Sequence, residues 1–143
     1  MSNRFRVTMI VLLLGTCLGS LSPAAEQPPV QMKQFVLGLL YKGSAWKQSA
    51  TDEAQRLQSA HMENINRLVD NGSMAVAGPI DSTGDLRGLF IFNVDTIEKA
   101  QALIATDPAI AAGQLRFELY VWYGPAAITD VVSRSRSSEG GRR

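Results

Sequence analysis

The chain has 143 residues, with 14 basic and 13 acidic side chains and a formal net charge of +1. A balance this close to neutrality excludes the strongly basic pattern of a nucleic-acid-binding protein, and we expect no nucleic-acid partner. The length suits one compact domain of about 100 residues with shorter segments at its ends.

The N-terminal segment resembles an export signal. Two arginines precede an apolar run over residues 7–21, and small residues follow up to Ala25. This order is typical of a secretory signal peptide, so we predict a signal at residues 1–25 and a periplasmic or secreted mature protein without a membrane span. The alternative is an uncleaved N-terminal anchor, for which the apolar run is short.

Cys17 is the only cysteine and lies inside the predicted signal. A mature chain that begins near Glu26 therefore has no disulfide, and its stability must come from an ordinary core. Residues 14–17 also resemble a lipoprotein signal, so a lipid anchor at Cys17 is a second hypothesis for the mature protein.

The first elements of the domain are a strand and a long helix. Residues 33–41 are almost all apolar, which predicts a strand covered on both faces. A polar loop containing Trp46 follows. The next segment, residues 51–71, predicts a helix that Thr51 or Ser49 can cap and that ends at Asn71-Gly72.

His61 is the only histidine and lies in this predicted helix. On a helical wheel, four apolar residues fall within about 40° of it; they are Ala54, Leu57, Ile65 and Leu68. His61 is therefore expected to face the core or a pocket. Its imidazole suits proton transfer near neutral pH.

Two strands, a helix and a last strand complete the predicted order. Residues 73–77 and 86–94 predict strands separated by Gly78-Pro79 and a turn at residues 81–85. Asp95 and Glu98 have the spacing of a capping box that opens a second helix. Residues 115–123 alternate between apolar and polar side chains, which predicts a strand.

The order β-α-β-β-α-β predicts an α+β, ferredoxin-like domain over residues 31–128. Right-handed crossovers place both helices on one face of a four-stranded antiparallel sheet. The other face has no predicted helix to cover it, so we expect a homodimer that packs sheet to sheet. Residues 129–143 are rich in Ser, Arg and Gly and are expected to be a disordered basic tail.

Several short motifs follow one another in a recognisable order. They are residues 61–68, Asn71-Gly72, Ala77-Gly78-Pro79, Leu86-Arg87-Gly88, residues 105–108 and Ala112-Gly113. Together they resemble the YCII-related domain family. The resemblance implies a dimeric α+β barrel, similar to muconolactone isomerases, in a family where a dehydrochlorinase is a rare characterised activity. It also implies a site built on a His and an Asp, which are His61 and Asp107 here. Many relatives carry a basic residue where this chain has Gln58.

A His-Asp pair is suited to general acid–base chemistry without a metal. The carboxylate holds the imidazole in one tautomer and stabilises its charged form, while the other ring nitrogen exchanges a proton with the substrate. One histidine and no clustered carboxylates make a metal site improbable, and the chain has no phosphate-binding glycine loop. We therefore expect no metal and no other cofactor.

Each candidate residue also has a structural interpretation. His61 alone on an apolar face is often a core ring bonded to a backbone carbonyl. Asp107 before a proline is a good helix N-cap. Further candidate ligand-binding residues are Trp46, Arg87, Gly78, Pro79, Tyr120 and Trp122; for the last two, a dimer-facing surface is the alternative. The sequence thus favours a lyase or isomerase acting on an unknown small organic molecule, with a non-catalytic ligand-binding or accessory dimer as the alternative.

Overall fold

The computed structural model describes residues 28–47 and 51–131. The predicted signal peptide, Cys17 and the tail beyond residue 131 lie outside these residues. The elements follow the order β1 (Met32–Lys42), α1 (Asp52–Asp70), β2 (Met74–Pro79), β3 (Leu86–Phe92), α2 (Ile97–Ile104), α3 (Pro108–Ala111) and β4 (Leu115–Pro125). No helix among the described residues is long and apolar enough to cross a membrane.

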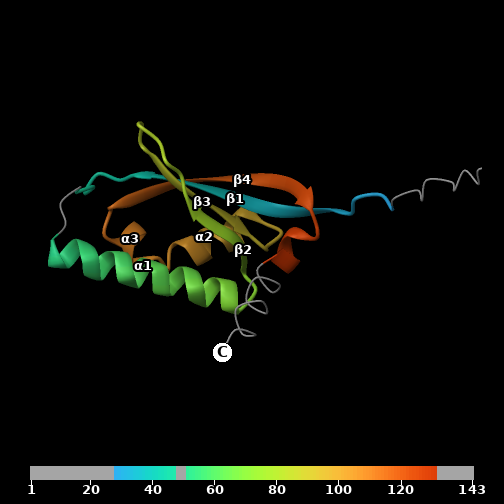
Figure 1. The fold of residues 1–143 in the computed structure, drawn as a ribbon, viewed down its shortest axis with the longest axis horizontal. Coiled ribbons are helices and arrows are strands. Elements are labelled where there is room, and N and C mark those ends of the chain that lie inside the picture. The colour runs from blue at the N-terminus through green and yellow to red at the C-terminus, as the bar shows by residue number, and fades with distance from the viewer. Residues whose placement is uncertain (1–27, 48–50, 132–143) are drawn as a thin grey trace, which may run out of the picture.

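The four strands form one antiparallel sheet in the order β2-β3-β1-β4. Figure 1 shows α1, α2 and α3 on the same side of this sheet. The predicted ferredoxin-like α+β fold is therefore confirmed. Strand β2 continues two residues beyond its predicted end and includes Pro79; an edge strand tolerates proline because its missing N–H need not pair.

Helix α1 has the boundaries that its sequence predicts. The Thr51 hydroxyl accepts a hydrogen bond from the Ala54 N–H at 3.2 Å, and the helix ends before Asn71 and Gly72. Gly72 has φ +76°, a backbone conformation that other residues rarely adopt.

The start of α2 differs from the prediction. Thr96, rather than Asp95, is the N-cap, and its hydroxyl accepts from the Lys99 N–H at 3.2 Å. Asp95 instead forms an ion pair with the Lys99 side chain at 2.6 Å. Both residues are competent caps, and the helix begins one residue later than the Asp95–Glu98 spacing suggests.

The main core lies between the sheet and the helices. Its buried residues come from α1, α2 and strands β1, β2 and β3, and they are Val36, Leu40, Ile65, Leu68, Met74, Phe90, Phe92, Ala100 and Ile104. Buried residues of α1 recur at spacings of three and four, from His61 to Leu68, which is the period of one helix face. The predicted apolar stripe of α1 therefore does face the sheet.

The opposite face of the sheet has a smaller cluster of its own. Phe35 is fully buried there with Ala75 and Ile91, and its ring lies 5.8 Å from that of Trp122. Ile128 also packs against this cluster, and residues 128–131 are helical. These residues form a helical turn where the disordered tail was expected to begin.

Candidate active site

Asp107 is held in place by the start of helix α3. Its side chain is the N-cap of α3, and one carboxylate oxygen, Oδ1, accepts a hydrogen bond from the Ala109 N–H at 2.9 Å. Pro108 occupies the first helical position, where a missing N–H costs nothing. Asp107 is only 1% exposed. The capping interpretation is correct, and it leaves the second oxygen available.

That second oxygen binds His61. The distance between His61 Nδ1 and Asp107 Oδ2 is 2.7 Å. When the carboxylate is ionised it can only accept, which assigns the proton of this hydrogen bond to Nδ1. The His61 ring is also stacked against Phe90, with ring centroids 6.1 Å apart and planes inclined by 27°. The imidazole is therefore held in position by a hydrogen bond on one side and an aromatic ring on another.

The other ring nitrogen, Nε2, is open to a cavity. Among the described residues no hydrogen bond reaches Nε2, and no buried side-chain nitrogen or oxygen lacks a partner. Nε2 is thus not sealed in the core, although His61 as a whole is only 8% exposed. The alternative of a core ring bonded to a backbone carbonyl does not describe this geometry. In its neutral form, the ring presents an unprotonated nitrogen to the cavity.

The cavity has a volume of about 500 Å³. It is lined by residues of α1, the β2–β3 pair and the loop after β1, with further contributions from β1, α3 and the start of β4. Its apolar walls include Leu40, Leu57, Met62, Ile65, Phe90 and Leu115. A site of this size with mostly apolar walls and a few polar groups is suited to a small organic ligand.

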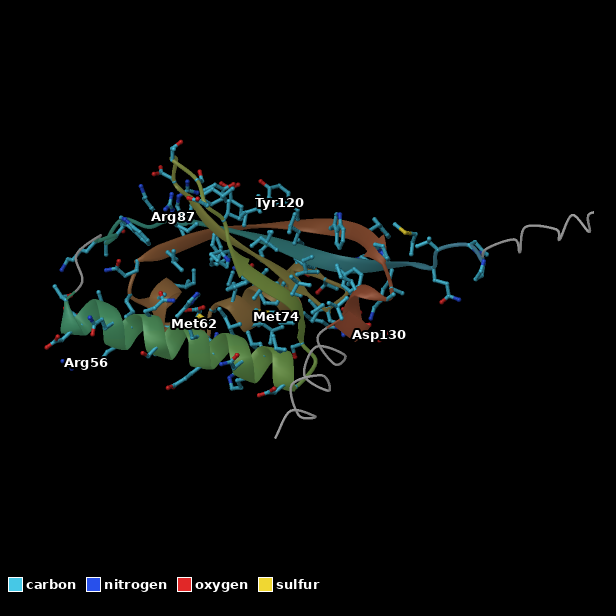
Figure 2. The ribbon with its side chains drawn as sticks, in the orientation of Figure 1. Arg56, Met62, Met74, Arg87, Tyr120 and Asp130 are labelled. Carbon is cyan, nitrogen blue, oxygen red and sulfur yellow. The ribbon has the colours of Figure 1, made fainter. Side chains whose placement is uncertain are left out.

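Four of the additional predicted residues line this cavity: Trp46, Gly78, Pro79 and Arg87. In Figure 2, Arg87 lies near the hairpin between β2 and β3, and Met62 lies on α1; both line the cavity. The tertiary structure therefore brings the loop after β1, the hairpin and helix α1 to one place.

Tyr120 and Trp122 do not line the cavity, and their assignment to it is corrected. They alternate along β4 with Leu119, which packs against the main core, so they point to the opposite face of the sheet. Figure 2 shows Tyr120 on the side away from α1. Trp122 packs against Phe35 instead.

Arg87 is fixed largely by backbone groups of its own hairpin. Its Nη2 donates to the carbonyls of Ser82, at 2.8 Å, and Gly84. The guanidinium carbon also lies 5.8 Å from the centre of the Trp46 ring, which is within the range of a cation–π contact.

Several cavity residues were not singled out from the sequence. Lys47 and Gln114 come from loops, and the Lys47 N–H donates to Gln114 Oε1 at 3.0 Å across the chain. No local pattern predicts that pair. Ala54 and Leu57, which the helical wheel places beside His61, also line the cavity.

A second set of hydrogen bonds joins α1 to the segment that carries Asp107. The Thr106 hydroxyl donates to Asn64 Oδ1 at 3.0 Å. Arg67 Nη2 donates both to Asn64 Oδ1, at 2.7 Å, and to the Thr106 hydroxyl, at 2.9 Å. Because Thr106 immediately precedes Asp107, these bonds hold the carboxylate segment against the helix that carries His61.

Another polar cluster lies on the opposite face of the sheet. The hydroxyls of Tyr120 and Tyr41 donate to Glu118 Oε2 at 2.8 and 3.3 Å. The hydrogen bond from Tyr120 lowers the pKa of Glu118, and the same bond raises the pKa of Tyr120. Desolvation, followed by the Glu118 charge, raises the pKa of Tyr41. This cluster does not contact the cavity.

The described part of the chain contains no group of three or more His, Cys, Asp or Glu side chains arranged to hold a metal ion. The polar groups of the site are thus a hydrogen-bonded acid–base pair and a few donors around an apolar space.

Comparison with known proteins identifies the family of this chain. No curated protein matches the chain. One solved structure that matches is 5-chloro-2-hydroxyhydroquinone dehydrochlorinase from Burkholderia phenoliruptrix AC1100, in complex with 2,5-dihydroxybenzoquinone. It is 20% identical with a TM-score of 0.43, and the match covers 60% of this chain and 92% of that one. The model of the YCII-related domain matches residues 35–122, which span β1 to β4 and include both His61 and Asp107. The chain therefore belongs to the YCII-related domain family.

Proposed function

We propose that this protein is a cofactor-independent acid–base enzyme, a lyase or isomerase acting on a small organic molecule. The observation that carries the proposal is that the two nitrogens of the His61 ring have different surroundings. Nδ1 is bound to the buried Asp107 carboxylate at 2.7 Å, while Nε2 has no partner among the described residues and adjoins the cavity. A histidine that only packs would have no reason to keep one nitrogen open to a ligand-sized space.

In this mechanism, Nε2 removes a proton from a carbon next to a carbonyl or to a leaving group. In an elimination, the C–H electron pair forms the new double bond, and the leaving group departs with its own pair. In an isomerisation, the imidazolium returns the proton to another carbon. Asp107 stabilises the imidazolium in both cases. Acid–base catalysis of this kind contributes roughly 10²–10⁴-fold to a rate.

The central test is NMR of candidate carbon acids in D₂O, with a panel of small lactones, keto acids and β-substituted ring acids. The wild type is expected to catalyse deuterium exchange or elimination on at least one compound. His61→Asn is expected to lose this activity, and Asp107→Asn to lose roughly 10²-fold or more. A wild type that binds panel members without exchange or turnover would instead identify the cavity as the site of a non-catalytic binding module.

A spectroscopic readout separates a structural role from a catalytic one. ¹⁵N NMR of the His61 ring is expected to show a protonated Nδ1 and an unprotonated Nε2 in the neutral form. Asp107→Asn should alter this tautomer balance, because an amide also offers a donor. A neutral ring with its proton on Nε2 would contradict the proposed base, since that nitrogen would have no lone pair to accept the substrate proton.

Two further proposals concern where and in what form the protein acts. The N-terminal sequence supports export. The sheet face away from the helices supports a homodimer, because it carries Tyr120, which is 48% exposed, beside the buried Phe35 cluster. Light scattering should give the mass of a dimer, and Tyr120→Arg should favour the monomer. A wild type that is monomeric at high concentration would refute the dimer.

A further inference from the structure

We propose that the ligand of this cavity is an anion, a carboxylic acid on an apolar, ring-sized body, with its acid group bound at Arg87. The inference deepens the proposed function by naming a substrate class for the same site. It concerns charge recognition, which is distinct from the proton transfer assigned to His61.

The charged residues that line the cavity are basic. They are Lys47 and Arg87, and no Asp or Glu lines it among the described residues. The two oxygens of the Asp107 carboxylate bind the His61 ring and the Ala109 N–H. No ion pair joins a carboxylate of the described chain to Lys47 or Arg87.

Arg87 is the most strongly positioned of these cations. It is half-buried, and it forms no ion pair with a carboxylate among the described residues. Its Nη2 binds the neutral carbonyls of Ser82 and Gly84, which fix the group without cancelling its charge. Nη1 has no hydrogen-bond partner in the described chain. Partial removal of a charge from water without a counter-ion is costly, and a bound carboxylate would relieve that cost.

The neutral polar groups of the cavity favour the same kind of ligand. Gln114 lines the cavity together with Lys47 and Arg87. Its Oε1 accepts from the Lys47 N–H, and its amide NH₂ is a donor without a hydrogen-bond partner in the described chain. The site is thus rich in donors, and an acceptor-rich group such as a carboxylate is its natural complement.

The rest of the cavity sets the shape of the ligand. Its walls are mainly aliphatic and aromatic, and its volume of about 500 Å³ accommodates a substituted ring. Trp46 lies against Arg87 at 5.8 Å from the guanidinium to the ring centre. An acid bound at Arg87 would therefore alter the surroundings of the Trp46 indole, which provides a direct optical signal.

The experiment uses matched pairs of neutral and charged compounds. Benzoate, phenylacetate and cyclohexene carboxylate are titrated beside their carboxamides, with tryptophan emission as the readout. Trp122→Phe leaves Trp46 as the only tryptophan, and thermal shift on the wild type gives a second readout that does not depend on this variant. At least one acid is expected to bind roughly 10–100-fold more tightly than its amide, as a charged hydrogen-bonded pair would provide.

The control variants isolate the position of the charge. Arg87→Gln is expected to remove most of the preference for the acid. Arg56→Gln, an exposed residue of α1 labelled in Figure 2 that does not line the cavity, is expected to keep it. Equal binding of acids and amides, an unchanged preference in Arg87→Gln, or no binding by any acid would each overturn the proposal.

The same titrations in His61→Asn keep this inference separable from the proposed function. Acids that bind His61→Asn and wild type alike, with no turnover in either protein, would uphold the anion site and refute the enzyme. Turnover of neutral compounds that is unchanged in Arg87→Gln would uphold the enzyme and refute the anion site.

Discussion

The two halves of helix α1 face the same sheet and meet different surroundings. In the C-terminal half, Leu68 is buried in the main core with residues of the strands and α2, and Ile65 belongs both to that core and to the cavity wall. In the N-terminal half, Ala54, Leu57 and His61 line a cavity of about 500 Å³. One apolar stripe therefore serves both packing and binding. The difference lies in what the sheet presents to it.

The side chains opposite the two halves differ in size. The packed half meets Met74 and Phe92, which are large and almost fully buried. Phe90 also lines the cavity, but its neighbours there from the same two strands include the small residues Ala77, Gly78 and Gly88. Small residues at these strand positions leave the cavity open, because larger side chains there would fill it. The cavity therefore lacks the packing contacts that stabilise the rest of the core.

The largest expected effect is in the packed half. Phe92 is 0% exposed, and Phe92→Ala should lower the free energy of unfolding by about 3–5 kcal/mol, measured by chemical denaturation. The matched change at the cavity, Leu57→Ala, should cost less than about 1 kcal/mol, because Leu57 already borders open space. Equal costs would show that the cavity is filled by the protein itself in solution.

The two strand glycines of the cavity should respond differently to a methyl group. A Cβ on Gly88 would lie 2.9 Å from the Gly78 carbonyl oxygen, whereas a Cβ on Gly78 would have no neighbour within 4 Å. Gly88→Ala is therefore expected to destabilise by about 1–3 kcal/mol. Gly78→Ala should be within about 0.5 kcal/mol of wild type. Thermal denaturation of both variants checks the pair, and a reversed order would contradict it.

At the boundary between the halves, Thr106→Val removes the hydroxyl that joins Asn64 and Arg67. Loss of these bonds should cost about 1–2 kcal/mol. A double-mutant cycle with Asn64→Ala should give a coupling of about 0.5–1.5 kcal/mol. If the bonds also position Asp107, the ¹⁵N signals of the His61 ring will change in Thr106→Val. If the two substitutions have additive effects on stability and the His61 ring signals do not change, these hydrogen bonds do not position Asp107.

The smallest effect concerns the face of the sheet away from both halves. The hydrogen bond to Glu118, followed by the Glu118 charge, raises the pKa of Tyr120. Glu118→Gln weakens the first and removes the second, so Tyr120 should ionise at lower pH, closer to its ordinary value of 10.0. Ultraviolet absorbance measures this shift directly. The lowered pKa of Glu118 also means that its small contribution to wild-type stability is present above its ordinary value of 4.5 and is lost as pH falls below it. Identical tyrosine titrations in the wild type and Glu118→Gln would contradict the hydrogen bond between Tyr120 and Glu118.

Local sequence patterns predicted the helices and strands, and they predicted part of the placement of His61 and Asp107. The period of three and four residues predicted that His61 faces inward, and Asp followed by Pro predicted the N-cap at Asp107, because both signals depend on backbone neighbours within one turn. The displacement of the α2 cap from Asp95 to Thr96 shows the limit of such signals when two adjacent residues are both good caps.

Local sequence patterns could not predict the rest of the site. Alternation predicted that Tyr120 and Trp122 share a face, but which face carries the helices follows from the crossover of the whole sheet. Lys47 and Gln114 meet across 67 positions of the chain, and no short-range pattern encodes such a pair. The pairing of His61 with Asp107, 46 residues apart, was implied by the family resemblance rather than by spacing.

The sequence alone determined the order of the elements, the direction in which His61 points and the cap that holds Asp107, since each follows from helix and strand periodicity and from capping chemistry. Only the tertiary structure decided that one carboxylate oxygen caps α3 while the other reaches His61, that Nε2 remains open, and that Arg87 and Trp46 border the same space. These features depend on how the β2–β3 hairpin and the loop after β1 meet α1, which is a matter of packing between segments distant in the chain.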